Sequence, residues 1–248
     1  MNEIHNRMLI FGHRGANNLA PENTFKSFRK AIELQADFIE FDLLETKDGR
    51  IVVCHDEEIS RLTGHHGFVR ELTLEELKTF DFGEGEKIIT FEELIELTKG
   101  KINLNSEVIV KGIANKVADI IKKYGIIESV LVSSFKHQEL LEFQKIDPNI
   151  KLGYLENNNY ESSCTWKEKE QWIQFCIDNN FYAINPFYPL VDQQFVDFAH
   201  NNNIKVFPYA VESAPAMRKL IKYRVDGIIT NDILKAKTVL LKENKINR

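Results

Sequence analysis

The sequence predicts an α/β protein, a TIM (β/α)8 barrel with a small insertion after the second strand. Three observations favour this fold: short apolar runs alternate with longer amphipathic stretches, eight such pairs fit the chain, and 248 residues is a usual length for one barrel. Alternating strands and helices imply right-handed crossovers and a parallel sheet. A doubly wound open sheet is the alternative that the same pattern permits.

The expected elements follow one another along the chain without a linker. MLIFG at 8–12 is the first strand, and Phe25, Phe28 and Ile32 recur at helical spacing after it. FIEFDLLET at 38–46 is the second strand. The later barrel strands are expected at 101–110, 129–134, 151–155, 182–186, 205–211 and 227–230, and the later helices at 91–99, 113–123, 136–145, 167–178, 191–200, 214–223 and from 232 onward.

Residues 51–90 are too many for a simple loop, so they predict an insertion between the second strand and its helix. The insertion begins with the apolar run IVVCH at 51–55 and continues as a polar segment rich in glycine and charge. Because no low-complexity linker divides the rest of the chain, we expect a single domain over residues 1–248.

Composition excludes several classes of protein. A formal charge of -5, with 43% hydrophobic and 28% charged residues, is typical of a globular chain and not of a disordered or collagen-like one. The acidic balance argues against nucleic acid as a partner, although local basic residues decide whether an anionic small molecule is bound. The oligomeric state stays open.

The cysteines and the apolar runs predict a cytoplasmic protein. Cys54, Cys164 and Cys176 form an odd, sparse set, which indicates reduced thiols. No apolar run reaches about 18 residues, so neither a membrane span nor stable membrane association is expected. The first apolar run is too short for a signal peptide and is expected to be a strand.

The second strand carries the first sign of chemistry. Alternation places Glu40 and Asp42 on one face and the apolar Ile39, Phe41 and Leu43 on the other. The carboxylates lie toward the C-terminal strand end, where barrel active sites lie. Two such groups repel each other unless they share protons or bind a cation, and Mg²⁺ or Ca²⁺ suits oxygen ligands. A surface or salt-bridged pair is the alternative.

The next barrel strand adds a third carboxylate. In NLNSEV, Asn103, Asn105 and Glu107 share one face, and Glu107 stands at the same strand end as the first two carboxylates. Three carboxylates at one strand end predict a metal site, and a buried polar network without metal is the alternative.

Two histidines and an arginine complete the candidate site. His13 ends the first strand, and His55 ends the run IVVCH. Two histidines at strand ends near carboxylates are typical of a general acid and base. Arg14 offers a planar fork that suits a phosphate. Together with a metal, these residues predict phosphodiester chemistry.

The motifs now resemble those of the glycerophosphodiester phosphodiesterase family. The order and spacing of its N-terminal motifs are specific: HRG at 13–15, PENT at 21–24, E-x-D at 40–42, TKDG at 46–49 and HD at 55–56. LNSE, SSF and VDGIITND are similar to later segments of the family, so the resemblance covers residues 10–235.

The resemblance implies a TIM barrel with a small insertion, a glycerophosphodiester substrate and a role in lipid and glycerol metabolism. The implied reaction is hydrolysis to an alcohol and sn-glycerol 3-phosphate with one divalent cation, Mg²⁺, Ca²⁺ or Mn²⁺. The implied site residues are the acid/base pair His13 and His55, the metal ligands Glu40, Asp42 and Glu107, the phosphate contact Arg14, and Glu22 at the rim or at a helix start.

Two positions depart from the family pattern. The family has a lysine two residues after the glutamate of the third barrel strand, where this chain has Ile109; Lys111 follows two residues later, either reaching back to the substrate or solvated. The seventh strand ends in Tyr209-Ala210-Val211-Glu212 in place of a Trp-Thr-Val-Asn-like sequence. Lys111 and Tyr209 are therefore the candidate substrate-binding residues at these places.

Two other functions stay open. A related barrel phospholipase acting on phosphatidylinositol or lysophospholipid would favour an exposed apolar rim, for which Phe68, Phe82, Phe187 and Tyr188 are the candidates. An inactive barrel that binds a phosphate ester would explain the departures. The intact histidines and carboxylates favour the phosphodiesterase.

Overall fold

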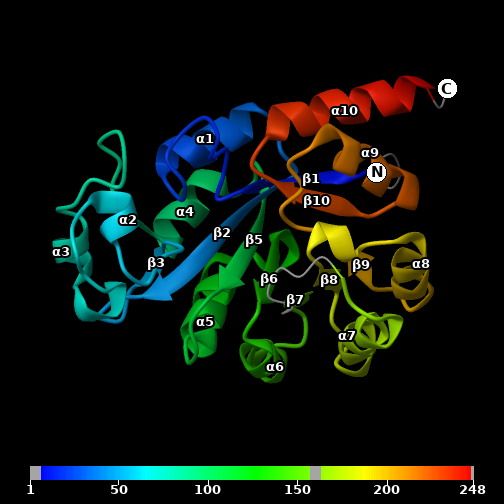
Figure 1. Cartoon of the computed structure of the whole chain (residues 1–248). Coiled ribbons are helices and arrows are strands. Elements are labelled where there is room, and N and C mark those ends of the chain that lie inside the picture. Colours follow the sequence, from blue (N-terminus) through cyan, green and yellow to red (C-terminus); the bar gives the residue numbers. More distant parts are fainter. Residues whose placement is uncertain (1–6, 157–162, 247–248) are drawn as a thin grey trace.

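The computed structural model describes residues 7–156 and 163–246. Within these ranges eight strands form one parallel sheet in the order β10-β1-β2-β5-β6-β7-β8-β9, which confirms the predicted α/β barrel (Figure 1). The predicted single domain over 1–248 includes three segments outside the described residues. The barrel strands are β1 (Leu9–His13), β2 (Phe38–Glu45), β5 (Asn103–Val108), β6 (Val130–Ser134), β7 (Lys151–Leu155), β8 (Ala183–Asn185), β9 (Lys205–Val206) and β10 (Gly227–Thr230).

The ladder of the described strands is interrupted between β9 and β10. The expected strand at 205–211 is wrong in length, since β9 ends at Val206. Pro208 has no N–H to donate to a ladder. Backbone hydrogen bonds still bridge the gap, because Asp226 N donates to Val206 O at 3.1 Å and Ile229 N donates to Pro208 O at 2.9 Å.

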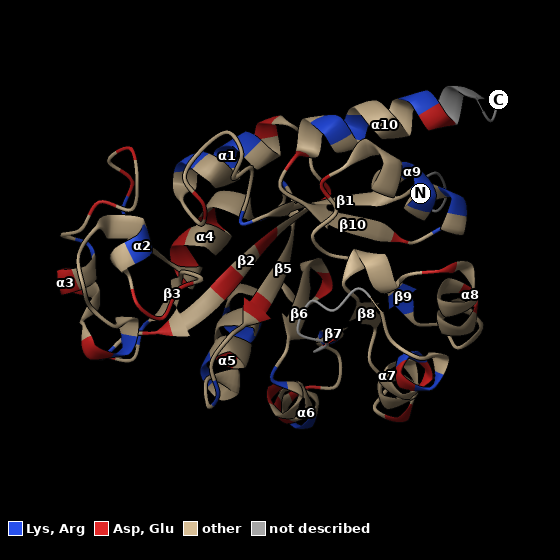
Figure 2. Cartoon of the chain, in the orientation of Figure 1, with Lys and Arg blue, Asp and Glu red and all other residues tan. Residues whose placement is uncertain are grey.

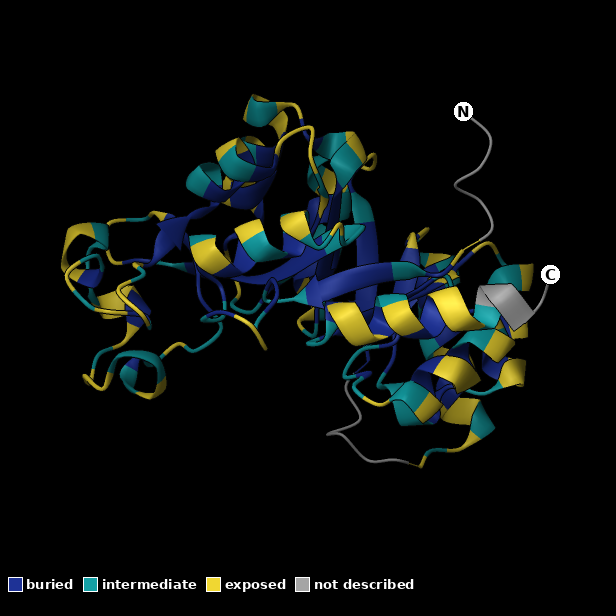
Figure 3. Cartoon of the chain, turned by 90° about the horizontal axis from the view of Figure 1, so that it is seen from above, coloured by how far each residue is buried: buried dark blue, intermediate teal, exposed yellow. Residues whose placement is uncertain are grey.

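A helix follows each of the barrel strands and packs on the outside of the sheet (Figures 1 and 3). Several helices begin at a side-chain cap, such as Thr24, whose hydroxyl accepts from the backbone N–H of Ser27. No helix in the described ranges is long and apolar enough to cross a membrane. These helices are α1 (Phe25–Glu33), α4 (Phe91–Thr98), α5 (Ala114–Tyr124), α6 (His137–Ile146), α7 (Trp166–Asp178), α8 (Gln193–Asn201), α9 (Ala214–Tyr223) and α10 (Ile233–Ile246).

The two faces of β2 separate the core from the site. Phe41 is buried in the core between the sheet and the outer helices. Phe38 points into the barrel, where its ring stacks on Phe11 at 4.3 Å between centroids, and Phe207 lies beyond at 4.9 Å from Phe11. Because side chains alternate along a strand, the face that begins with Phe38 continues with two carboxylates toward the barrel mouth.

The predicted insertion extends the outer half of β2. β3 (Ile51–Val53) pairs antiparallel with β2, and β4 (Ile89–Thr90) pairs with β3. Between β3 and β4 lie the short helices α2 (Ser60–Thr63) and α3 (Leu74–Leu77) and a 3-10 turn at Val69–Glu71. Two further 3-10 turns, Ile127–Ser129 and Tyr188–Leu190, belong to the barrel and not to the insertion. The insertion has a small core of its own: Leu44, Val52, Cys54, Ile59, Val69, Leu77, Phe82 and Ile88.

The turn between β1 and α1 is closely packed. Gly15 has a φ of +86°, and a Cβ at this position would lie 2.2 Å from the Ser27 Oγ and 2.9 Å from the Ser27 carbonyl carbon. Ser27 Oγ in turn donates to the Arg14 carbonyl oxygen at 2.7 Å. The turn that carries Arg14 is therefore held against the start of α1.

We expect Gly15→Ala to destabilise the protein more than Gly112→Ala. Both glycines have a φ of +86°, but no atom lies within 4 Å of a Cβ built at Gly112. In both variants the left-handed backbone lowers the free energy of unfolding by about 1–2 kcal/mol, because alanine has a Cβ. Gly15→Ala loses about 1–3 kcal/mol more from overpacking. Urea unfolding measures the difference, and equal losses would contradict the packing seen here.

Candidate active site

Strand register brings three carboxylates together at the barrel mouth. On β2, Glu40 lies opposite Asn105 of β5, and Asp42 lies opposite Glu107. Each of the three carboxylates has an oxygen within 4.8 Å of an oxygen of the other two. The acidic bands that cross β2 and the head of β5 in Figure 2 mark this region.

The cluster is electrostatically strained. Glu40 and Asp42 are 3% and 1% exposed. Burial and the adjacent Asp42 charge raise the pKa of Glu40 well above its usual range, and burial with the charges of Asp42 and Glu40 does the same for the pKa of Glu107. Arg14 and Lys136 partly offset the rise at Glu107.

Neutral donors hold the carboxylates in place without satisfying them. The Arg14 backbone N–H donates to Glu40 Oε2 at 3.0 Å, and Asn23 Nδ2 donates to Asp42 Oδ2 at 2.8 Å. Asp42 Oδ1 is buried and has no hydrogen-bond partner among the described residues. Three close carboxylates with a buried oxygen left over fit a hard divalent cation.

Arg14 and Glu22 belong to a chain of alternating charges. Arg14 Nε lies 3.4 Å from Asp42 Oδ2, and its Nη1 donates to Glu22 Oε1 at 2.8 Å. Glu22 also accepts from Arg61 Nη2 at 2.7 Å, and Arg61 Nε donates to Asp56 Oδ2 at 2.6 Å. Arg61 is not predicted from the sequence, because α2 carries no motif that points to the site.

His13 is fixed through one ring nitrogen. Its Nδ1 lies 2.6 Å from Asn231 Oδ1, which also accepts from Asn17 Nδ2 at 2.7 Å. Since an amide oxygen only accepts, the His13 proton sits on Nδ1 and donates to Asn231. His13 Nε2 then faces the cluster, 3.9 Å from Glu40 Oε2. Burial and the Arg14 charge lower the pKa of His13.

His55, like His13, is held through its Nδ1 atom. Its Nδ1 lies 2.6 Å from Asp56 Oδ1, which leaves its Nε2 available. The preceding residue is tied to the cluster strand, because the Cys54 backbone N–H donates to the Asp42 carbonyl at 3.0 Å. Each histidine thus has a second residue that fixes its ring, Asn231 and Asp56.

Lys111 is solvated, one of the two alternatives left open for it, and a second lysine, Lys136, lies near Glu107. Lys111 lies beyond β5, which ends at Val108, and it is exposed at the edge of a pocket. Lys136, two residues after the end of β6, lines the same pocket and acts electrostatically on Glu107. A lysine two residues after a barrel strand end is the signal that could have identified it.

Tyr209 lies on the β7–β8 side of the mouth. Its hydroxyl donates to Glu156 Oε1 at 2.9 Å, and its ring contacts Phe135 and Phe187 with centroids 6.0 and 5.7 Å apart. Glu156 directly follows β7, is fully buried, and was not among the predicted site residues.

Most of the aromatic residues proposed for an apolar rim are buried or partly buried. Phe82 is buried in the insertion core. Phe187 and Tyr188 are partly buried and pack on each other. Phe68 is 39% exposed and carries the Arg70 guanidinium 5.1 Å over its ring.

Comparisons with known proteins agree with the fold and the motifs. The model of the glycerophosphoryl diester phosphodiesterase family matches residues 13–235. A glycerophosphodiester phosphodiesterase from Caldanaerobacter subterraneus subsp. tengcongensis is 38% identical over 239 residues, which cover 91% of this chain and 95% of that protein.

Solved structures match as well. A glycerophosphodiester phosphodiesterase from Thermotoga maritima has a TM-score of 0.79 at 28% identity, over 96% of this chain and 99% of that one. An Oleispira antarctica phosphodiesterase in complex with the product sn-glycerol-3-phosphate has a TM-score of 0.80 at 23% identity, over 93% and 96% of the two chains, and shows the likeness of fold. The predicted resemblance is confirmed: the chain belongs to the glycerophosphoryl diester phosphodiesterase family.

Proposed function

We propose that this protein hydrolyses glycerophosphodiesters to sn-glycerol 3-phosphate and an alcohol, with one divalent cation held by Glu40, Asp42 and Glu107. The convergence of these carboxylates beside His13, with His55 held by Asp56 one residue after the Cys54 backbone bond to Asp42, carries the proposal. The relative that is 38% identical and bears the name of this activity supports it.

The chain's own residues would divide the work at the phosphate. A bound cation would offset the three negative charges and polarise a phosphoryl oxygen. The Arg14 guanidinium is held between Asp42 and Glu22, and its remaining N–H groups would donate to the phosphate. Because both ion pairs fix the fork in advance, little side-chain freedom is lost when substrate binds.

The partners of the two histidines suggest their roles. His13 bonds to a neutral amide, so its Nε2 suits the general base that activates the nucleophile. The nucleophile would be either water or the neighbouring hydroxyl of the glycerol. Attack by that hydroxyl would give a cyclic phosphate intermediate. His55 bonds to the Asp56 carboxylate, which stabilises an imidazolium, so His55 suits the acid that protonates the leaving alkoxide.

The alternatives find less support. Of the four aromatic residues named for a lipid-binding rim, one is exposed, which disfavours a phospholipase. The carboxylates lie close to one another and to His13, and His55 follows Cys54, whose backbone N–H donates to Asp42; this arrangement disfavours an inactive barrel. Mg²⁺, Ca²⁺ or Mn²⁺ would suit the oxygen ligands. A cytoplasmic location is in keeping with the three free cysteines.

The first test concerns the cation. Adding Mg²⁺ or Ca²⁺ to EDTA-treated protein should raise its melting temperature, because the cation binds the folded cluster. Glu40→Gln should weaken cation affinity by more than about tenfold, about 1.4 kcal/mol, in isothermal titration calorimetry. Glu33→Gln, on the exposed side of α1, is the control. Full activity in excess EDTA, or unchanged affinity in Glu40→Gln, would contradict the metal site.

The second test concerns the histidines. His13→Ala and His55→Ala should each lower kcat by about 10²–10⁴-fold, since each removes a positioned acid or base. Steady-state assays on one glycerophosphodiester measure this loss, and circular dichroism checks that both variants are folded. A near-normal rate in either variant would remove that histidine from the mechanism.

The third test concerns the residue that positions His13. Asn231→Leu removes the acceptor for His13 Nδ1–H, so the ring loses its orientation and kcat should fall by at least about tenfold. Asn231→Asp keeps an acceptor at the same place and should recover most of the rate. Cation affinity, measured in parallel, should stay the same in both variants. Equal losses of kcat in the two variants would argue against this role.

A further inference from the structure

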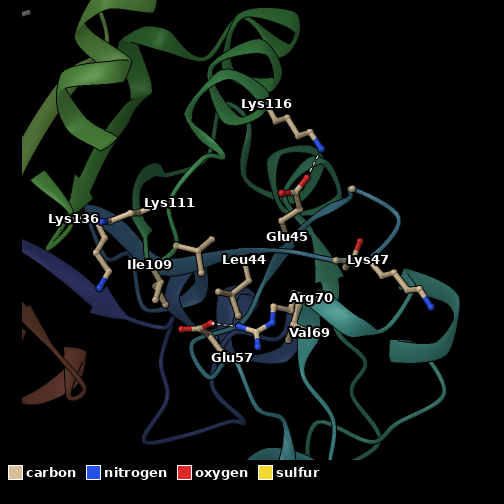
Figure 4. A pocket seen from close by; sticks show the side chains of 13 residues that line it. Leu44, Glu45, Lys47, Glu57, Val69, Arg70, Ile109, Lys111, Lys116 and Lys136 are labelled. Atoms are coloured by element: carbon tan, nitrogen blue, oxygen red, sulfur yellow. Dashed lines mark hydrogen bonds and ion pairs between the residues drawn. The ribbon is translucent and has the colours of Figure 1, made fainter. Parts of the chain in front are cut away.

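A pocket of about 640 Å³ opens between the insertion and the ends of β2 and β5 (Figure 4). This volume is typical of a small-molecule site. The pocket has an apolar floor and a charged wall. Its lining consists of Leu44, Glu45, Thr46, Lys47, Gly49, Glu57, Val69, Arg70, Ile109, Val110, Lys111, Lys116 and Lys136.

The pocket begins where the carboxylate cluster ends. Asp42 and Glu107 are paired across β2 and β5, and the next residues of the same parity, Leu44 and Ile109, line the pocket. Two residues of extended chain span about 7 Å, so the floor lies one step outward from the cluster. The floor of the pocket is therefore adjacent to the carboxylates along both segments of the chain.

The pocket lies on the side of His55. Glu57, two residues after His55, lines it, and the Val69 backbone N–H ties this loop to the wall by donating to the Glu57 carbonyl at 2.8 Å. His13 and its partner Asn231 lie on the other side of β2, at β1 and beyond β10. If His55 protonates the leaving alkoxide, the leaving alcohol occupies this pocket.

The pocket is basic although the whole chain is acidic. The lining holds five cationic side chains and two carboxylates, whereas the formal charge of the whole protein is -5. Glu45 pairs with Lys116, and Glu57 lies 3.8 Å from Arg70 (Figure 4). The three remaining cations, Lys47, Lys111 and Lys136, have no carboxylate oxygen within 4 Å in the described part of the chain.

We propose that this pocket binds a leaving alcohol that carries a second anionic group. The preferred substrates would then be glycerophosphodiesters with an anionic head group, such as a phosphorylated polyol, over those with a cationic one, such as choline. The proposal rests on the proposed function and names its substrate class. Three unpaired ammonium groups attract an anion and repel a quaternary amine, and the apolar floor lies beneath the carbon frame of the alcohol.

The test compares two substrates that differ by one phosphate. Wild-type protein should cleave glycerophosphoinositol 4-phosphate with a kcat/KM at least about tenfold above that for glycerophosphoinositol at low salt, and glycerophosphocholine should be the poorest. The advantage should shrink as salt rises, because the lysines are exposed and salt screens exposed charges. Equal values for the two inositol substrates would overturn the proposal.

Charge reversal locates the effect. Lys111→Glu and Lys47→Glu should each lower the ratio of the two inositol kcat/KM values by at least about fivefold. Lys242→Glu, which makes the same change in net charge on exposed α10, should keep the wild-type ratio. A ratio that falls equally in all three variants would assign the preference to the overall charge of the protein and overturn the pocket.

Failure of the proposed function is recognised separately. If none of the three substrates is cleaved, the phosphodiesterase proposal fails, and calorimetric binding of inositol 4-phosphate alone then decides about the pocket. Binding that Lys111→Glu weakens and Lys242→Glu leaves intact supports an anion site there. Absence of binding, or binding that all variants retain, overturns it.

Discussion

Repulsion among Glu40, Asp42 and Glu107 is the constraint on which the rest of the site depends. The three side chains place oxygens within 4.8 Å of one another, two of them in almost fully buried positions. Burial and neighbouring charge raise the pKa of Glu40 and of Glu107, so the ionised cluster is unstable without compensation. Arg14 and Lys136 offset part of this charge, and the Arg14 backbone N–H and the Asn23 amide each donate to one of the carboxylates.

The turn after β1 supplies the donors at the cost of an unusual backbone. Arg14 and Asn23 both have positive φ values, +52° and +57°, and each directs an N–H group at one carboxylate. Their conformation is stabilised by close packing, since Gly15 leaves no room for a Cβ against Ser27 and the Asn23 backbone N–H donates to the Arg14 carbonyl. The HRG and PENT motifs are thus two ends of one structure that serves the cluster.

The cluster also divides the mouth into two halves. On one side, His13 is fixed by Asn231, which follows β10. On the other, His55 is fixed by Asp56, and the insertion and the pocket lie beyond it. In a glycerophosphodiester the glycerol and the alcohol extend from the phosphorus in different directions. A mouth with two unlike halves can therefore recognise each part separately. The insertion, with a hydrophobic core of its own, can vary one half without disturbing the barrel.

The sequence by itself determined the barrel, the orientation of β2 and the neighbouring position of Glu107, because alternation along a strand and the order of parallel strands follow from local patterns. It also placed the insertion, whose length exceeds that of a loop. Only the tertiary structure decided the short β9, where Pro208 interrupts the ladder, and the positions of Arg61, Asn231 and Lys136 around the site. These residues stand in segments without periodicity, and their contacts join positions as far apart as His13 and Asn231. Such contacts depend on how the barrel brings its first and last strands together. Local sequence patterns do not encode contacts between positions so far apart in the chain.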